Sequence, residues 1–270
     1  MSAGDFAVST EDDVIAVVAA AGHLAPLPQR GNRWAHLTLC VLDAVFSISA
    51  RYDTTCRTVH DYATHVGLAH VLEPADRVEA GAFIPTEEPV AALRQRIEEQ
   101  GPDEFARVVL RNRQRTSARG GVLKAEAARE YAVILDQHGL HRLPDVAALL
   151  AHEVQLRAVE TDLAQVPGHG AYGIRTGYLW MLAGSDDLIK PDRMVLGWLA
   201  AVLGRTPSVP EARILVRAAA SELGATAWQL DHAIWAAQRG QRRRPAQPAH
   251  LGGATRQGLR LERRLVGRER

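Results

Sequence analysis

The feature that most constrains the fold is the helical spacing of apolar residues, which recurs in segment after segment and is closed by glycine. It is seen in "TEEPVAALRQRIEEQG", "SVPEARILVRAAASELG" and "TAWQLDHAIWAAQRG". Alternating runs of β-branched and aromatic residues, which would indicate strands, are nearly absent. The sequence therefore predicts an all-α protein with no strands, built from about eleven short helices.

One segment differs from the others because it is apolar around most of its circumference. This segment, "RWAHLTLCVLDAVFSISA", predicts a buried central helix. Asp43 lies in its middle, where an apolar setting would raise the pKa of the carboxyl group. Asp43 either faces a pocket or satisfies buried backbone donors.

Composition excludes several classes of protein. Of the 270 residues, 47% are hydrophobic and 23% are charged, as in an ordinary soluble globular protein. The two cysteines, Cys40 and Cys56, cannot form a disulfide framework or a metal-binding cluster, so we expect a reducing, cytoplasmic setting and no metal. No secretory signal is apparent, and the apolar stretches are too short to cross a bilayer, so no membrane association is expected.

Charge is distributed unevenly along the chain. Residues 239–270 carry ten Arg against two Glu, a local balance of +8 that leaves about −7 for residues 1–238. With Pro, Gly and Gln interspersed, this basic tail is expected to be disordered, and it either aids solubility or contacts polyanions without specificity. Since the rest of the chain is acidic, any contact with DNA must be local.

A glycine-rich loop raises the main functional question. Gly168, Gly170 and Gly173 match the G-x-G-x-x-G pattern of dinucleotide-binding folds, which requires a buried strand before the first glycine. The residues before this loop instead alternate polar and apolar side chains at helical spacing. We therefore expect no nucleotide cofactor.

The same loop fits a tight hairpin between two helices. Pro167 would end the first helix, Gly168 and Gly170 permit positive φ, and the second helix would begin near Ala171. The first backbone N–H groups of that helix have no acceptors within it and would form a site for a phosphodiester oxygen. His169 either donates to a phosphate or is merely exposed, and the hairpin as a whole could also be an ordinary one that binds no ligand.

The stretch "LAQVPGHGAYGIRTGYLWML" resembles the helix-hairpin-helix of the endonuclease III-like DNA glycosylase superfamily, whose motif reads roughly L-P-G-[VI]-G-x-x-T-A. In that family a V-D-T-H-V segment follows, and "KPDRMV" places Asp192 and Val195 at its Asp and second Val. The segment "GGVLKAEAARE" resembles the family's G-x-x-x-x-K-A segment and places Lys124 at its Lys. The resemblance covers roughly residues 34–205.

The resemblance implies two helical subdomains with a groove for double-stranded DNA between them. Residues 34–187 would form a six-helix barrel carrying the hairpin at about 154–183. Residues 1–33 and 188–238 would pack together as a discontinuous helical bundle.

The resemblance also implies a reaction. Asp192 would be the catalytic carboxylate, stabilising the positive charge that develops on the sugar as a base departs and orienting the attacking water. The alternative is a helix start at which an acidic residue favours the dipole. Bifunctional members of the family carry a nucleophilic Lys where this chain has Tyr172, so cleavage of the DNA strand is not expected. The family's four-cysteine motif is missing as well, so no iron–sulfur cluster is expected.

Further side chains are candidates for contacts with DNA. A flipped base must be held between flat or apolar surfaces, and the candidates for its pocket are Tyr172, Tyr52, Trp180 and Asp43. The segment "RVVLRNRQRTSARGG" predicts a basic loop just before Lys124, and phosphate contacts are expected from Arg113, Arg115, Arg119 and Lys124.

The leading hypothesis is thus a monofunctional DNA glycosylase of base excision repair, acting at the nucleoid. The alternatives are a catalytically inactive helix-hairpin-helix DNA-binding protein and a helical protein-interaction module.

Overall fold

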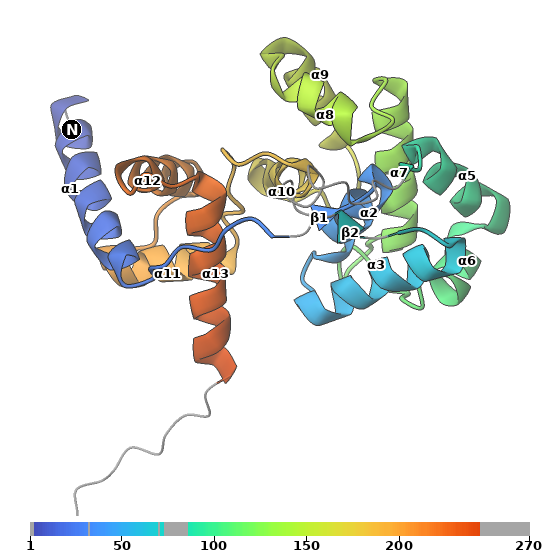
Figure 1. The fold of residues 1–270 in the computed structure, drawn as a ribbon, viewed down its shortest axis with the longest axis horizontal. Helices are drawn as coiled ribbons and strands as arrows, with labels where there is room; N and C mark the ends of the chain where they lie inside the picture. The colour runs from blue at the N-terminus through green and yellow to red at the C-terminus, as the bar shows by residue number, and fades with distance from the viewer. Residues whose placement is uncertain (1–2, 32, 70, 73–85, 244–270) are drawn as a thin grey trace, which may run out of the picture.

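A computed structural model of the protein describes residues 3–31, 33–69, 71–72 and 86–243. Over these residues the chain forms twelve α-helices and one short 3₁₀ turn, so the predicted all-α class is confirmed (Figure 1). None of the described helices is both long and apolar enough to cross a membrane.

Two very short strands depart from the prediction of an entirely strand-free chain. β1 (Arg33–Trp34) pairs with β2 (Val71–Leu72) in antiparallel register, with Arg33 opposite Leu72 and Trp34 opposite Val71. Each strand has two residues, too few for an alternating pattern that could be read from the sequence.

The first hydrophobic core is built around a central helix, α2 (Leu37–Phe46), whose ten residues are all buried, as the apolar segment predicts. The helices that contribute to this core with α2 are α3 (Tyr52–Val66), α5 (Val90–Gln100), α6 (Pro102–Val108), α7 (Lys124–Gln137), α8 (Leu143–Leu150), α9 (Glu153–Leu163) and α10 (Ile174–Ala183). The helix pairs α2–α3, α2–α7, α2–α10 and α5–α7 are in contact.

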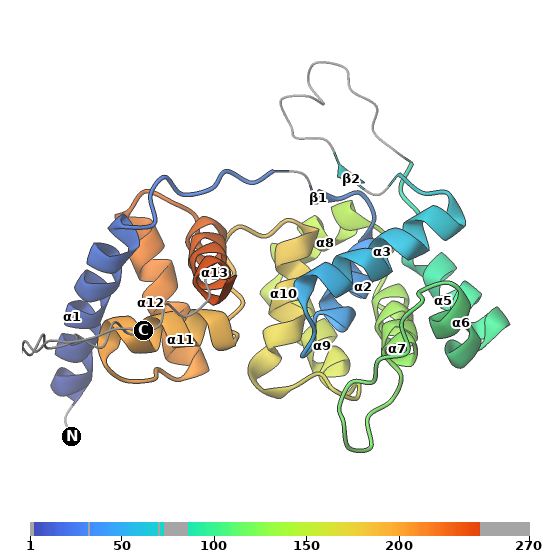
Figure 2. The ribbon, with the colours of Figure 1, turned by 90° about the horizontal axis from the view of Figure 1, so that it is seen from below.

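The second core joins the two ends of the described chain. α1 (Ala3–Gly22) packs on α11 (Arg193–Leu203) and on α12 (Val209–Glu222), and α13 (Ala227–Arg243) packs on α11 and α12. Figures 1 and 2 show these four helices gathered at one end of the molecule. The chain passes between the two cores twice, after α1 and again after α10.

The division into two subdomains stays a prediction, and the two separate cores support it. The start of the predicted disordered tail at residue 239 is wrong, because α13 continues to Arg243 and Arg239 pairs with Asp53. Residues 244–270, which make up the rest of the predicted tail, lie outside the described residues.

Candidate functional site

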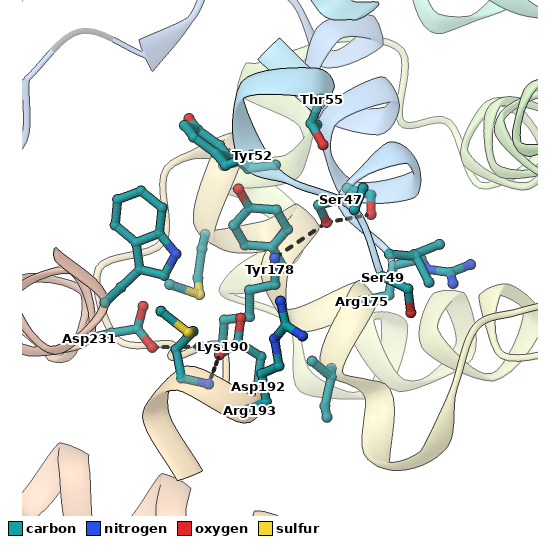
Figure 3. A pocket seen from close by; sticks show the side chains of 18 of the residues that line it. Ser47, Ser49, Tyr52, Thr55, Arg175, Tyr178, Lys190, Asp192, Arg193 and Asp231 are labelled. Atoms are coloured by element: carbon teal, nitrogen blue, oxygen red, sulfur yellow. Dashed lines mark hydrogen bonds between the residues drawn. The ribbon is translucent and has the colours of Figure 1, made fainter. Parts of the chain in front are cut away.

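A cleft of about 900 Å³ is lined by residues from helices and connecting segments of both cores (Figure 3). The lining includes Ser47 from the segment after α2, Tyr52 from α3 and Tyr178 from α10, and also Trp228 and Asp231 from α13. A concave site between two packed bodies is a common location for ligand binding.

The predicted hairpin is present and opens onto this cleft. The loop between α9 and α10 contains η1 (Ala171–Gly173), so the second helix begins with a 3₁₀ turn and α10 itself starts at Ile174. Gly168 and Gly170 have φ of +82° and +80°, as expected for the turn. Gly168, Gly170 and Ala171 are exposed and line the cleft, whereas the exposed Pro167 does not line it.

His169 lines the cleft but is buried rather than exposed. Its ring lies 3.2 Å from the Tyr131 hydroxyl and 3.4 Å from the Thr176 hydroxyl, measured from Nδ1. Burial, together with the nearby Arg175, lowers the pKa of His169. The structure therefore gives this side chain a place inside the hairpin, with hydroxyl groups rather than solvent around it.

Asp192 is the N-cap residue of α11 and lines the cleft. Its Oδ1 accepts hydrogen bonds from the backbone N–H groups of Met194, at 2.7 Å, and Val195, at 3.4 Å. The side chain is half-buried, and Oδ2 makes no hydrogen bond within the described part of the chain. Asp192 can therefore cap the helix with one oxygen while the other oxygen stays available.

Lys190 was not singled out by the sequence, yet it lies in the cleft two residues before Asp192. Its Nζ donates to Ser47 Oγ at 3.3 Å and lies 3.5 Å from the centre of the Tyr178 ring. Burial lowers the pKa of Lys190, while the carboxyl groups of Asp192, Asp43 and Asp231 act in the opposite direction. This places a cation among three carboxyl groups.

Only one of the predicted base-pocket residues lies on the cleft surface. Tyr52 lines it and packs edge to face against Trp235, with 5.4 Å between the ring centres. Asp43 is buried behind the wall, where it accepts hydrogen bonds from Trp34 Nε1 (2.8 Å) and Tyr178 Oη (3.1 Å). Burial raises its pKa. Asp43 therefore fixes two side chains that do line the cleft.

The other two aromatic candidates are not at the cleft. Trp180 is fully buried in the first core and donates to Glu160, so its assignment to the base pocket is wrong. Tyr172 is 63% exposed, has a φ of +62° and does not belong to the cleft lining. Its backbone oxygen accepts a hydrogen bond from Arg213 of α12, which connects the hairpin to the second core.

The predicted phosphate-binding cations divide into two groups. Arg113, Arg115 and Arg119 are exposed on a loop and are not among the residues that line the cleft; Arg113 pairs with Asp103, and Arg115 donates to the Gly121 carbonyl. For these three, the phosphate contact stays a prediction. Lys124 is 2% exposed and donates to the carbonyls of Phe46 and Ile48 and to Gln114. With these three bonds made, the predicted phosphate contact of Lys124 is wrong.

One face of α13 is a second feature that the sequence reasoning missed. Trp228, His232, Trp235 and Arg239 are spaced four, three and four residues apart and all line the cleft. Trp228 stacks on His232 with ring centres 4.9 Å apart, and His232 stacks on Trp235 at 5.6 Å. The signal was present in "TAWQLDHAIWAAQRG", but a Trp stripe at helical spacing is also what a core-facing helix shows.

The cleft lining carries a net positive charge, whereas residues 1–238 taken together carry a net negative charge. The lining contains three Asp, namely Asp53, Asp192 and Asp231, against seven basic residues: Arg30, Arg33, Arg51, Arg175, Lys190, Arg193 and Arg239. A positive cleft in an acidic body concentrates its attraction for polyanions at one place. No group of three or more His, Cys, Asp or Glu side chains among the described residues could hold a metal ion.

These observations define an all-α protein with two cores and, between them, a cleft whose lining is mainly basic and includes three aspartates. Residues 12–239 match the model of a family described as a domain of unknown function, DUF8548, and the chain belongs to that family. Neither the curated proteins nor the solved structures contain a match to the chain.

Proposed function

We propose that this protein is a monofunctional DNA glycosylase that hydrolyses the N-glycosidic bond of a damaged or mispaired base. The observation that carries the proposal is that the hairpin glycines and Asp192 line one positively charged cleft. The resemblance to the endonuclease III-like superfamily supports the same proposal, because it associates a hairpin of this kind with a following aspartate.

DNA would be held first by its backbone. The exposed loop of Gly168, Gly170 and Ala171 and the basic residues of the cleft offer donors and positive charge to phosphates. A base must then leave the duplex to reach the reacting groups, and the 900 Å³ cleft has room for one. Tyr52 and Trp235 supply flat surfaces at its wall.

Asp192 would act on the sugar. As the bond to the base breaks, positive charge develops on the deoxyribose, and a nearby carboxylate stabilises that charge. The oxygen not used for capping can also accept a proton from the water that attacks C1′. Such an enzyme would act on chromosomal DNA in the cytoplasm, and the products would be a free base and an abasic site.

The experiment is a panel of duplexes carrying deaminated, alkylated or mismatched bases, incubated with wild type and with Asp192→Asn and then treated with alkali. Wild type is expected to release at least one base, and Asp192→Asn to be slower by about 10²–10⁴-fold. Asn retains an oxygen that can cap α11, so the fold should survive. Ser208→Ala, which removes the side-chain cap of α12, is the control for capping alone and should keep full activity.

Two outcomes would contradict the proposal. If wild type leaves every base in place, there is no glycosylase activity of this kind. If borohydride traps a covalent complex with an abasic site, and Lys190→Gln abolishes it, the enzyme is bifunctional through the cleft lysine rather than monofunctional.

A catalytically inactive DNA-binding protein is the second candidate. The capping bonds of Asp192 favour it, because they give the aspartate a structural role that needs no substrate. It predicts salt-dependent DNA binding that survives Asp192→Asn, with no base released by wild type.

A further inference from the structure

Asp231 is one of the three aspartates that line the cleft and is contributed by α13. The residue is 7% exposed and belongs to the cleft lining. Its Oδ1 accepts a hydrogen bond from the backbone N–H of Lys190 at 3.0 Å, which fixes the orientation of the carboxyl group. Oδ2 has no hydrogen-bond partner within the described residues.

Among the described residues, no direct ion pair holds this carboxyl group in the charged form. The Lys190 ammonium is directed to Ser47 and the Tyr178 ring, and the hydrogen bond from Lys190 to Asp231 comes from its backbone N–H (Figure 3). The residues by which α11 and α12 pack in the second core are apolar; they include Val195 and Leu199 of α11 and Val216 of α12.

Burial raises the pKa of Asp231 to about 7, and the neighbouring charge of Asp192 adds to this effect. The Lys190 backbone N–H and the Lys190 charge act in the opposite direction. His232 follows Asp231 on α13, and Arg193 lies on the same cleft; burial lowers the pKa of His232. Near neutral pH a large fraction of Asp231 therefore carries a proton.

We propose that Asp231 is the general acid of this cleft and protonates the base as it departs. The inference rests on the proposed function and adds the second catalytic group. Two carboxyl groups in one site can have opposite roles when their surroundings differ: Asp192 accepts two charge-assisted backbone bonds at a helix N-terminus, whereas Asp231 is buried and has one.

The N-glycosidic bond breaks and its electron pair moves to the base nitrogen, while the proton on Asp231 passes to an acceptor atom of the base. Water forms the new bond to C1′ and gives a proton to Asp192. Exchange with solvent restores both carboxyl groups, so that the net reaction is DNA plus water giving free base and abasic site.

The chemical class of substrate follows from this assignment. Neutral bases such as hypoxanthine or uracil would leave as anions, so a proton donated to the base makes them better leaving groups. N7-alkylated purines already carry positive charge and leave without one. A general acid at Asp231 therefore matters for neutral bases and not for cationic ones.

The experiment compares Asp231→Asn with wild type in single-turnover base release, using one neutral and one N7-methylated base, between pH 5.5 and pH 9. On the neutral base, the wild-type rate is expected to fall tenfold per pH unit above about pH 7. Below pH 7 the variant should be slower than wild type by about 10²-fold on the neutral base, and its rate should lose this pH dependence. On the cationic base, both proteins should agree within about threefold.

The outcomes separate the two proposals. If wild type releases no base at all, the proposed function fails, and this inference fails with it. If wild type releases a neutral base and Asp231→Asn releases it equally fast, or if the variant is slowed equally on both bases, Asp231 is not the acid and the glycosylase proposal stands. Asp187→Asn, a change at an exposed aspartate outside the lining, is the matched control.

A further measurement detects the proton without substrate. Because the folded-state pKa of Asp231 is above its unfolded value, the native state binds the extra proton between about pH 4 and pH 7, and the stability it contributes is lost as pH rises through 7. The urea midpoint of wild type relative to Asp231→Asn should therefore fall between pH 5 and pH 8. A constant difference would overturn the inference, and should the variant not fold, the pH profiles of wild type on the two bases decide it.

Discussion

At the scale of single residues, Lys124 shows how a charged side chain can belong to the core. α2 ends at Phe46, and the last carbonyl groups of a helix lack partners within it. The Lys124 ammonium donates to the carbonyls of Phe46 and Ile48, at 3.0 and 2.8 Å, and so fixes the turn that leads to the cleft. Burial, with the neighbouring charge of Arg175, lowers its pKa to about 8.

We expect Lys124→Met to destabilise the fold by about 2–3 kcal/mol, because Met keeps the aliphatic stem but leaves buried acceptors unpaired. Urea unfolding would measure the loss. Arg119→Met on the exposed loop is the control and should change stability by less than about 0.5 kcal/mol. Unchanged stability combined with weaker DNA binding in Lys124→Met would restore the phosphate contact that the structure contradicts.

At the scale of elements, the hairpin between α9 and α10 depends on two glycines in different surroundings. A Cβ on Gly168 would lie 2.3 Å from Thr116 Cβ, so the basic loop packs directly against the turn there. A Cβ on Gly170 would meet nothing within 4 Å. Both have positive φ, so they differ mainly in the space available.

This difference gives a matched pair of variants. Gly170→Ala should cost about 1–2 kcal/mol, the strain of a left-handed conformation alone. Gly168→Ala should cost more, because Thr116 and its loop must also move. Denaturant unfolding of the two variants checks the order, and equal losses would mean that the contact with Thr116 is readily relieved.

At the scale of the whole molecule, Arg30 connects the two chain passages between the cores. From the segment after α1 it donates to Asp186 (2.7 Å) and to the carbonyls of Met181 (3.0 Å) and Ser185 (2.9 Å), and its guanidinium lies 4.4 Å from the Trp228 ring centre. A planar group with several donors is needed to make all these contacts at once.

Arg30→Lys keeps the charge but cannot reproduce this set of bonds, so we expect a loss of about 1–2 kcal/mol and faster hydrogen exchange around residues 181–186. Arg157→Lys, at an exposed ion pair with Glu153, should have almost no effect. Exchange rates at 181–186 that match wild type would show that the passages are held by other contacts.

The class of fold could be predicted from the sequence because helical periodicity and glycine stops are local signals. The buried helix around Asp43 and the hairpin glycines were predicted for the same reason. Whether the side chains of Lys124 and Trp180 point into the core or toward the surface could not be predicted. A charged or aromatic residue at the edge of the apolar face of an amphipathic helix can do either. The contact between Lys190 and Asp231 joins residues 41 positions apart, so only the folded chain brings them together.

The cleft has walls from two separately packed cores, joined by two passages of the chain. A ligand that spans the cleft therefore contacts both walls. Its binding free energy stabilises the association of the two cores rather than one core alone. With the cleft filled, the two halves should melt as one cooperative unit, and with the cleft empty either half can loosen first.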